Sequence, residues 1–236
     1  MIKPLGILNA VCLLIVILCF SVEIPTFSKS FYSSEYDKYR IPAQIQVPKD
    51  DLMLVTGKLL AYMKGQSPDL VIEANIAGEY HEFFNSREKD HMVDVRNLIL
   101  GGMTIRNYAL AVIVASIIIT YIFRIKFIRI LIKSIKHVFV GFLIIITLLI
   151  TFVVLNFEKA FTIFHELFFN NDLWILNPDT DLLVNIVPLG FFMDISAVLS
   201  VIFVILCLAT ITISILAERL LFRRLDTFVN KGTLNC

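Results

Sequence analysis

The sequence has few charged residues and almost no excess of either sign. Of its 236 residues, 17% are charged and 58% are hydrophobic, and the formal net charge is +1. A soluble domain usually has about 25% charged and about 45–50% apolar residues. This shortage of charge argues against an ordinary soluble globular protein, although the length allows one or two domains.

Charge is missing mainly from four stretches of 17 to 23 residues. They lie between residues 3 and 23, 106 and 124, 137 and 158, and 194 and 218. A helix of roughly 20 apolar residues crosses a bilayer core of about 30 Å, so we predict four transmembrane helices. The first stretch could instead be a cleaved signal peptide. We interpret it as a retained anchor because its apolar run is long and no small-residue cleavage site follows.

The predicted fold is an α-helical integral membrane protein with four transmembrane helices and a small extracellular α+β cap. In chain order we expect a first transmembrane helix (1–22), an extracellular cap (23–106), a second transmembrane helix (107–123), a basic cytoplasmic interfacial loop (124–137), a third transmembrane helix (138–157), a second extracellular segment completing the cap (158–194), a fourth transmembrane helix (195–217) and a cytoplasmic tail (218–236).

The distribution of basic residues predicts the orientation. Short cytoplasmic loops carry an excess of Lys and Arg. Segment 124–136 has five basic residues and no acid, whereas 158–194 has one basic and six acidic residues. We therefore expect both termini in the cytoplasm and the cap outside the cell. Within 126–136 the basic residues follow helical spacing, which predicts an amphipathic helix at the inner interface; fixing the topology is its simplest role, and binding of anionic lipid is the alternative.

Local patterns predict the elements of the cap. Apolar residues alternate over 41–47 and again occupy 71–76, which favours two strands. A helix is expected over 50–64, capped by Asp50 or Asp51 and stopped by Gly65, and another over 87–100, with Ser86 as N-cap and an end at Gly101-Gly102. The helix of the third span is expected to continue to about Phe169. A turn at 177–179 and a short apolar stretch to Pro188 complete the cap.

Missing motifs exclude several chemistries. The cysteines lie in predicted spans or at the C-terminal residue, so the cap has no disulfide and no thiol nucleophile. There is no G-x-S-x-G elbow, H-E-x-x-H motif, phosphate-binding loop or dinucleotide fingerprint. Because no predicted span contains an internal charge, a transporter is also disfavoured. Transfer without a protein-bound intermediate, or non-catalytic binding, remains.

Three of the four histidines, His81, His91 and His165, lie in the predicted outer segments. His91 precedes the second span by about four turns and His165 follows the third by about two, so the two can meet where the cap joins the membrane. Two imidazoles there could serve as general base and general acid near neutral pH. Ordinary hydrogen-bonded histidines are the plain alternative. A zinc site using all three is conceivable, but no close ligand spacing supports it.

Aromatic residues surround His165 in the sequence. A helix would place it among Phe161, Phe164, Phe168 and Phe169, and the chain's one tryptophan, Trp174, follows. Such residues are also typical of the aromatic belt at a membrane surface. A histidine within the belt, close to several acidic residues, is less ordinary.

Two longer patterns resemble a known family. The segments Arg87-Glu88-Lys89-Asp90-His91-Met92-Val93-Asp94-Val95-Arg96 and Phe164-His165-Glu166-Leu167-Phe168-Phe169-Asn170-Asn171-Asp172-Leu173-Trp174, followed by Asn177-Pro178, resemble those of the bacterial lipoprotein intramolecular transacylases (Lit). The resemblance covers essentially the whole chain, with four spans, a long first outer segment and a short second one.

This resemblance implies an acyltransferase with two catalytic histidines, matching His91 and His165. The family moves the sn-2 acyl chain of a diacylglyceryl-modified lipoprotein cysteine to that cysteine's own α-amino group, which gives the lyso-form lipoprotein. We expect six residues to support the site or line the substrate: Arg87, Asp94, Phe164, Phe168, Asp172 and Trp174. Of these, Asp94 could orient His91.

The expected partners are the diacylglyceryl lipoprotein and membrane lipids, with no nucleic acid, no cofactor and no metal ion, and we expect a monomer. The active site is expected at the extracellular face of a multi-pass protein of the bacterial cell membrane. Two alternatives remain open at this point. One is a metal-dependent lipid hydrolase, and the other is a non-catalytic envelope protein that binds lipid or lipoprotein.

Overall fold

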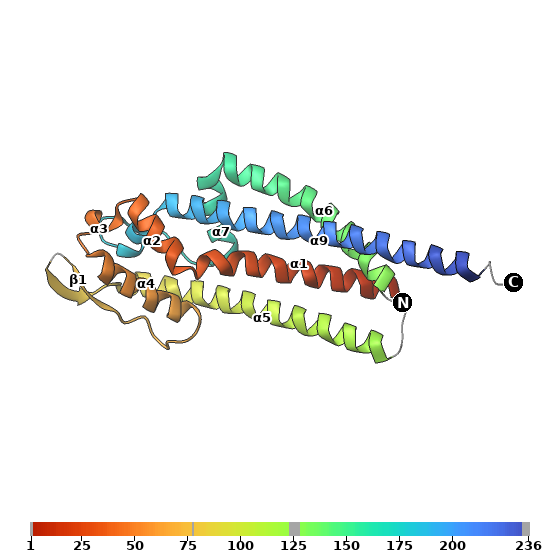
Figure 1. The fold of residues 1–236 in the computed structure, drawn as a ribbon. Helices are drawn as coiled ribbons and strands as arrows, with labels where there is room; N and C mark the ends of the chain where they lie inside the picture. The colour runs from red at the N-terminus through yellow and green to blue at the C-terminus, as the bar shows by residue number, and fades with distance from the viewer. Residues whose placement is uncertain (1, 77, 123–127, 233–236) are drawn as a thin grey trace. The chain divides into compact units, whose positions relative to one another are not determined.

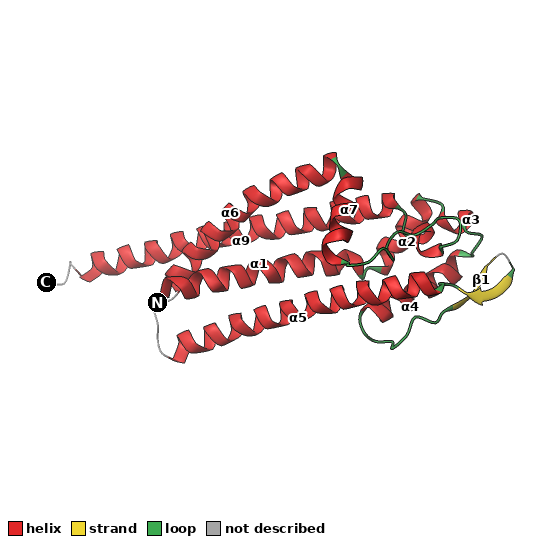
Figure 2. Ribbon diagram, turned by 180° about the vertical axis from the view of Figure 1, so that it is seen from behind, coloured by secondary structure: helices red, strands yellow, loops and turns green. Residues whose placement is uncertain are grey.

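The computed structural model describes residues 2–76, 78–122 and 128–232. The chain is mostly helical, and strands occur in one hairpin of the described residues (Figure 2). In chain order the elements are α1 (Ile2–Thr26), α2 (Lys29–Lys38), α3 (Ile41–Gln44), α4 (Lys49–Met63), β1 (Glu73–Ile76), β2 (Glu79–Glu82), α5 (Ser86–Ile122), α6 (Ile128–Leu155), α7 (Phe157–Phe168), α8 (Leu182–Ile186) and α9 (Leu189–Gly232).

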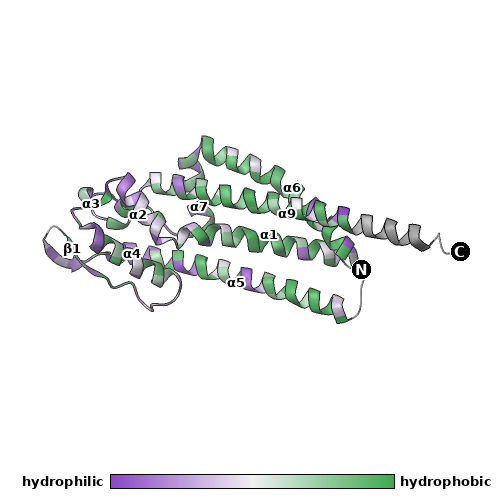
Figure 3. Ribbon diagram, viewed as in Figure 1, coloured by the Kyte–Doolittle hydropathy of each residue, from purple (hydrophilic) through white to green (hydrophobic). Residues whose placement is uncertain are grey.

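In the described part of the chain, four helices, α1, α5, α6 and α9, are long and apolar enough to cross a membrane (Figure 1). Hydrophobic residues dominate α1, α6 and much of α9, whereas hydrophilic residues gather on α2 and the hairpin (Figure 3). The prediction of a helical membrane protein with four spans and a small α+β region is therefore confirmed. The chain is a multi-pass membrane protein.

The chain divides into two compact units, and the first consists of Met1–Ser21, Ile105–Thr151 and Ser200–Cys236. Within it, α1 lies between α5 and α9 in both views (Figures 1 and 2). Phe139 of α6 and Phe203 of α9 are buried against Leu14 and Ile17 of α1. On the other side of α1, small and branched residues allow close packing, with Ala109 of α5 next to Val16.

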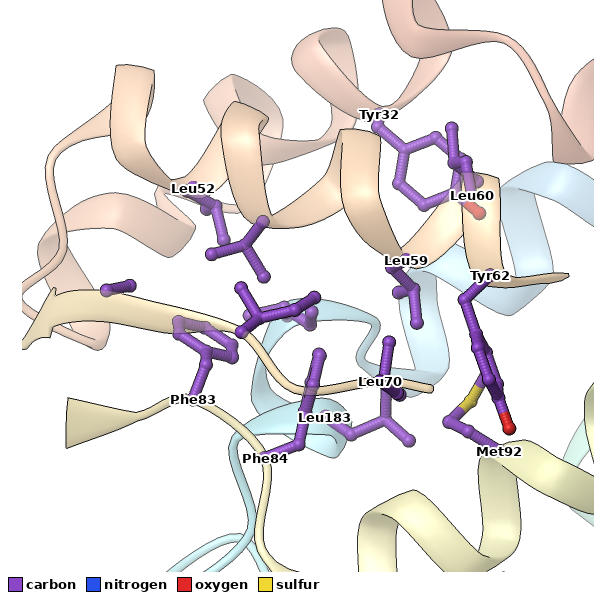
Figure 4. Packing of buried hydrophobic residues seen from close by; sticks show 14 of the residues in the cluster. Tyr32, Leu52, Leu59, Leu60, Tyr62, Leu70, Phe83, Phe84, Met92 and Leu183 are labelled. Atoms are coloured by element: carbon purple, nitrogen blue, oxygen red, sulfur yellow. The ribbon is translucent and has the colours of Figure 1, made fainter. Parts of the chain in front are cut away.

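The second unit, Val22–Thr104 and Phe152–Leu199, has its own hydrophobic core. Helix α4 lies across this core with buried residues at helical spacing, among them Leu52, Val55 and Leu59. Figure 4 shows Phe83 and Phe84, which follow the hairpin, packed beneath this face. This apolar core makes the unit a stable support for the residues attached to it.

The hairpin forms in the region where a strand was expected at 71–76. Strand β1 pairs antiparallel with β2, and Glu73 lies opposite Glu82. The turn contains Gly78 with a φ of 98°, a left-handed conformation that favours glycine. The side chain of Asn75 stabilises the same turn by accepting a hydrogen bond from the Gly78 N–H at 2.9 Å.

The other predicted strand, over 41–47, is wrong. The chain forms the short helix α3 there, because Arg40 adopts a left-handed conformation at φ 52° and Pro42 occupies the first turn. Proline fits the first turn of a helix, where its missing N–H has no partner to lose. Four alternating apolar residues over 41–47 are too short a signal to decide against these backbone constraints.

Helix boundaries also differ from the prediction. Helix α5 continues through Gly101 and Gly102 without a break, because both keep helical geometry and the following apolar residues extend the helix. Pro48, rather than an aspartate, is the N-cap of α4, and Asp50 and Asp51 lie in its first turn. The expected stop at Gly65 is confirmed, since this residue has a φ of 73°.

The helix of the third span breaks at Asn156, where φ is −140°, instead of continuing to Phe169. Helix α7 therefore starts in a new direction directly after α6. At the other end, α6 begins at Ile128, so residues 129–136 are its first turns and not a separate interfacial helix. Arg124 and Lys126 lie outside the described residues.

Candidate active site

A capping box holds the start of α5, which carries His91. The Asn85 side chain accepts a hydrogen bond from the Glu88 N–H at 3.0 Å, and the Glu88 carboxylate accepts one from the Asn85 N–H at 2.7 Å. Such reciprocal bonds satisfy backbone donors that a helix start leaves free. The buried Glu88 also accepts from the N–H of Leu183 at the start of α8. His91, one and a half turns after Asn85, therefore stands on an anchored segment.

Helix α7 carries His165 on its buried face. Ile163, Phe164, Leu167 and Phe168 are exposed, whereas His165 is 7% exposed. The His165 Nδ1 lies 2.7 Å from the carbonyl oxygen of Phe161. A carbonyl can only accept, so Nδ1 carries the hydrogen and the Nε2 of the neutral ring is left as an acceptor.

The structure brings His91 and His165 together from segments 74 residues apart. Their ring centroids are 6.2 Å apart with an interplanar angle of 34°. Both residues are 7% exposed, and the whole pair belongs to the second unit. The Nδ1 of His91 is buried and has no hydrogen-bond partner among the described residues. A buried polar atom without a hydrogen bond raises the free energy of the folded protein. A bound molecule that forms a hydrogen bond with this nitrogen would remove that cost.

Aromatic rings enclose the pair. Trp174 stacks on His165 at 4.8 Å, and Phe161 lies 4.1 Å from the same ring. Phe169 contacts both histidines, at 5.3 Å from His91 and 5.6 Å from His165. These contacts restrict the rotation of the two imidazoles and keep water away from them.

The predicted lining residues Phe164 and Phe168 occupy different positions. The ring of Phe164 is 5.4 Å from His165, whereas Phe168 packs on Phe164 at 4.9 Å. Both rings are nearly half exposed. Phe164 thus joins the histidine cluster, and Phe168 extends the apolar surface beside it.

Two polar contacts fasten the segment before Trp174 to α5. Arg87 donates a hydrogen bond to the backbone oxygen of Asp172, and its guanidinium is 3.6 Å from the Asp172 carboxylate. Asn171 donates to Asp94 at 2.8 Å. This bond of Asp94 holds the loop that carries Trp174. The expected role of Asp94 in orienting His91 stays a prediction. Asn171 was not among the predicted residues, and the polar run 170–172 was the one signal pointing to it.

Burial determines the charge state of His165. Desolvation lowers its pKa below the ordinary 6.5, and the bond to the Phe161 carbonyl opposes this only in part. His165 is therefore neutral at pH 7, with a free Nε2 lone pair. A neutral imidazole can accept a proton, which a general base requires.

His81 lies elsewhere. It belongs to β2, is exposed, and pairs with Glu79 at 3.0 Å on the same strand. Among the described residues, no group of three or more His, Cys, Asp and Glu is placed to hold a metal ion. The three-histidine zinc site considered from the sequence is thus not formed by the residues described.

Solved structures with a similar fold are those of the membrane-integral lipoprotein intramolecular transacylase Lit from Bacillus cereus. One has a TM-score of 0.70 at 21% identity and covers 93% of this chain and 98% of the other. Two further structures of that protein, each with one histidine replaced, by arginine or by alanine, have TM-scores of 0.66 and cover 93% of this chain. They cover 94% and 96% of the other chain, also at 21% identity.

No curated protein sequence matches the chain. A family model described as lipoprotein intramolecular transacylase Lit does match, over residues 7–192. That range contains both histidines, the aromatic residues around them and the loop between Asn171 and Trp174. The chain belongs to the lipoprotein intramolecular transacylase family.

Proposed function

We propose that His91 and His165 catalyse transfer of the sn-2 acyl chain of a diacylglyceryl-modified lipoprotein cysteine to the α-amino group of the same cysteine. The observation that carries this proposal is the buried contact between the two imidazoles, 6.2 Å apart, in a transacylase-family chain. The product is an N-acyl, S-monoacylglyceryl lipoprotein. Nucleophile and ester belong to one substrate, so the protein needs no nucleophile of its own.

His165 acts as the base in this proposal. An α-amino group has a pKa near ~8, so a modest fraction is unprotonated at neutral pH. Its nitrogen attacks the ester carbonyl, and Nε2 of His165 accepts the proton that the nitrogen loses. The hydrogen bond from Nδ1 to Phe161 supports this role because it leaves Nε2 as the acceptor. The same type of bond occurs at His137, so it defines the tautomer and does not by itself mark a catalytic residue.

His91 acts on the carbonyl oxygen and the glyceryl oxygen of the ester. Attack places negative charge on the ester oxygen, and collapse of the tetrahedral intermediate releases the glyceryl oxygen as an alkoxide. An N–H of His91 stabilises this charge and gives a proton to the alkoxide. One proton leaves the amine and one reaches the glyceryl oxygen, so the reaction consumes none overall. Exchange between the two neighbouring rings restores both histidines.

The aromatic residues hold the substrate in a folded conformation. The reaction joins two ends of one flexible molecule, and holding such groups together can lower a barrier by up to about 7–11 kcal/mol. Trp174, Phe161 and Phe169 surround the imidazoles and leave little room for water. Excluding water matters because it would hydrolyse the ester.

We further propose that the site faces the cell exterior, with both termini in the cytoplasm. Arg129, Lys133 and Lys136 lie in the first turns of α6, which fits retention of that end in the cytoplasm. In this proposal the substrate reaches the site from the surrounding membrane lipids. The enzyme acts as a monomer, without a partner chain and without nucleic acid. Reporter fusions at the C-terminus and in the hairpin would test the orientation. A reporter signal that arises only outside the cytoplasm, coming from the C-terminal fusion, would contradict it.

The pH dependence of the reaction tests His165 as base. Between about pH 6.5 and 8 the rate should rise with pH as the substrate amine loses its proton. Below the pKa of His165, which burial lowers from 6.5, Nε2 is also protonated, so the rate should fall more steeply with decreasing pH. Single-turnover conversion in mixed micelles from pH 5 to 9 would measure this. A steep limb that begins above pH 7 would contradict the assignment.

Replacing Asp94 with alanine separates its two suggested roles. The loss of its bond to Asn171 should loosen the Trp174 loop and reduce conversion by roughly tenfold, in line with the cost of small misplacements of reacting groups. The pH profile should keep its shape, because His91 and His165 remain. Asp90→Ala, at an exposed position on the same helix, is the matched control. A change in the shape of the pH profile in Asp94→Ala would instead indicate that Asp94 acts directly on one of the two histidines.

A further inference from the structure

A cluster of charged residues outside the candidate active site joins the start of α9 to α2. Asp194 of α9 accepts hydrogen bonds from Lys38 Nζ and from Tyr39 Oη, the latter at 2.6 Å. Tyr39 passes directly over Gly190, where an added methyl group would come within 2.5 Å of the tyrosine oxygen. The absence of a side chain at Gly190 therefore allows Tyr39 to reach Asp194.

A second carboxyl group completes the cluster. Glu35 of α2 is 7% exposed, and no group in the described part of the chain donates a hydrogen bond to its buried Oε2. The Asp194 carboxyl lies within hydrogen-bonding reach. Two carboxylates at that range repel each other unless one carries a proton. Burial, and then the neighbouring Asp194, raise the pKa of Glu35, so Glu35 is the group that holds the proton and donates it to Asp194.

The other charged and titratable groups that face the pair favour the same arrangement. Lys38 and Tyr39, both from the α2 side, donate to Asp194 and stabilise its negative charge. The bond to Asp194 raises the pKa of Lys38, which keeps this residue charged. The result is one carboxylate with three donors around it, in a unit that also contains the histidine pair.

The start of α9 connects this cluster with His165. Phe191 packs on Tyr32 of α2 at 5.0 Å, while its neighbour Phe192 packs on Phe161 of α7 at 5.2 Å. Phe161 in turn contacts the His165 ring at 4.1 Å and accepts the bond from its Nδ1. A rotation of the first turns of α9 would move Phe192 and so remove the support behind Phe161.

We propose that Asp194 is a positioning residue: held by Glu35, Lys38 and Tyr39, it fixes the start of α9 so that Phe192 supports Phe161 and the His165 ring. This inference rests on the proposed function. It assigns no contact with substrate to Asp194. Its main effect appears in the rate of the chemical step, because misplacing His165 weakens the base.

Substitutions in the cluster test the proposal by kinetics of purified protein on a synthetic diacylglyceryl lipopeptide in mixed micelles. Asp194→Ala should lower kcat by roughly tenfold with little change in KM. Tyr39→Phe, which removes one hydroxyl group and keeps the ring, should give a smaller loss of the same kind. Asp37→Ala is the matched control, since Asp37 is an exposed residue of α2 that pairs with Lys49 at 2.6 Å. It should retain the wild-type kcat.

Two further measurements separate positioning from general stability. In a double-mutant cycle, the effects of Asp194→Ala and Phe192→Leu on kcat should be less than additive, because both act through Phe161. Glu35→Gln should stay active, since its amide can donate as the protonated acid does, whereas Glu35→Ala should not. The ratio of wild-type to Glu35→Gln rates should fall as the pH rises through the Glu35 pKa.

The outcomes are distinguishable. If the wild type converts no substrate, the proposed function fails. If the wild type converts it and Asp194→Ala or Tyr39→Phe keeps full kcat, the positioning role alone is overturned. Additive effects in the cycle, or a flat rate ratio with pH, also contradict it. Should Asp194→Ala fail to fold, Tyr39→Phe and the Glu35 pair decide the question.

Discussion

Replacing His165 with alanine should reduce conversion of diacylglyceryl lipoprotein to the lyso form by about 10²–10⁴-fold, the usual contribution of a general base. The same size of loss is expected for His91→Ala, because the tetrahedral oxygen and the departing alkoxide lose their donor. The two losses should not add, since each variant already breaks the proton relay between the rings. Mass spectrometry of lipoprotein N-termini, from a host that expresses each variant, measures the converted fraction.

Two controls make this result specific. His165→Phe preserves a flat ring against Trp174, so its expected inactivity would exclude a simple packing defect. His81→Ala removes an exposed histidine of the hairpin and should leave conversion unchanged. Retained conversion by His165→Phe or His91→Ala would contradict the roles assigned to the pair. Membrane insertion of every variant is checked by its yield in the membrane fraction.

The largest expected effect on stability comes from the core of the second unit. Phe83 is 1% exposed and meets Phe84 edge to face at 5.0 Å beneath α4 (Figure 4). Phe83→Ala leaves a cavity that surrounding helices cannot fill, and it should lower the free energy of unfolding by about 3–5 kcal/mol. Thermal unfolding in detergent, followed by circular dichroism, would show a lower midpoint.

Tyr80 provides the matched control for this substitution. It lies in the same hairpin but is 75% exposed, so Tyr80→Ala should change stability by no more than about 0.5 kcal/mol. If Phe83→Ala is as stable as Tyr80→Ala, the packing beneath α4 does not hold the unit together. Activity of Phe83→Ala should fall only in proportion to the unfolded fraction, because the residue does not touch the histidines.

The four spans were predictable because the thickness of the bilayer sets a minimum apolar length, and no tertiary contact is needed to read it. The ends of the helices were harder to predict. Gly101 and Gly102 favour a helix end locally, yet the apolar residues that follow keep α5 helical. The reverse occurs at Asn156, where nothing in the apolar pattern signals the change of direction between α6 and α7.

The histidine pair was predictable because two separate segments place His91 and His165 close to the ends of neighbouring spans. The hydrogen-bond partners of the residues around this pair were not predictable. Asp94 and His91 are three positions apart on α5, which suggested that Asp94 orients His91, but this spacing gave no sign that Asp94 bonds to Asn171. The role of Asp194 was also hidden, since sequence spacing gives no sign that a residue of the fourth span meets Lys38 and Tyr39, about 155 positions earlier.

The stacking of Trp174 on His165 gives the enzyme a built-in optical reporter. The chain has one tryptophan, so its emission comes from this position alone. A protonated imidazole quenches indole fluorescence much more strongly than a neutral one, and the two rings are 4.8 Å apart. Emission should therefore follow the charge of His165 without any label, and brominated acyl chains should quench it on arrival. Titration of the base and entry of the lipid can thus be observed separately, before any acyl group moves.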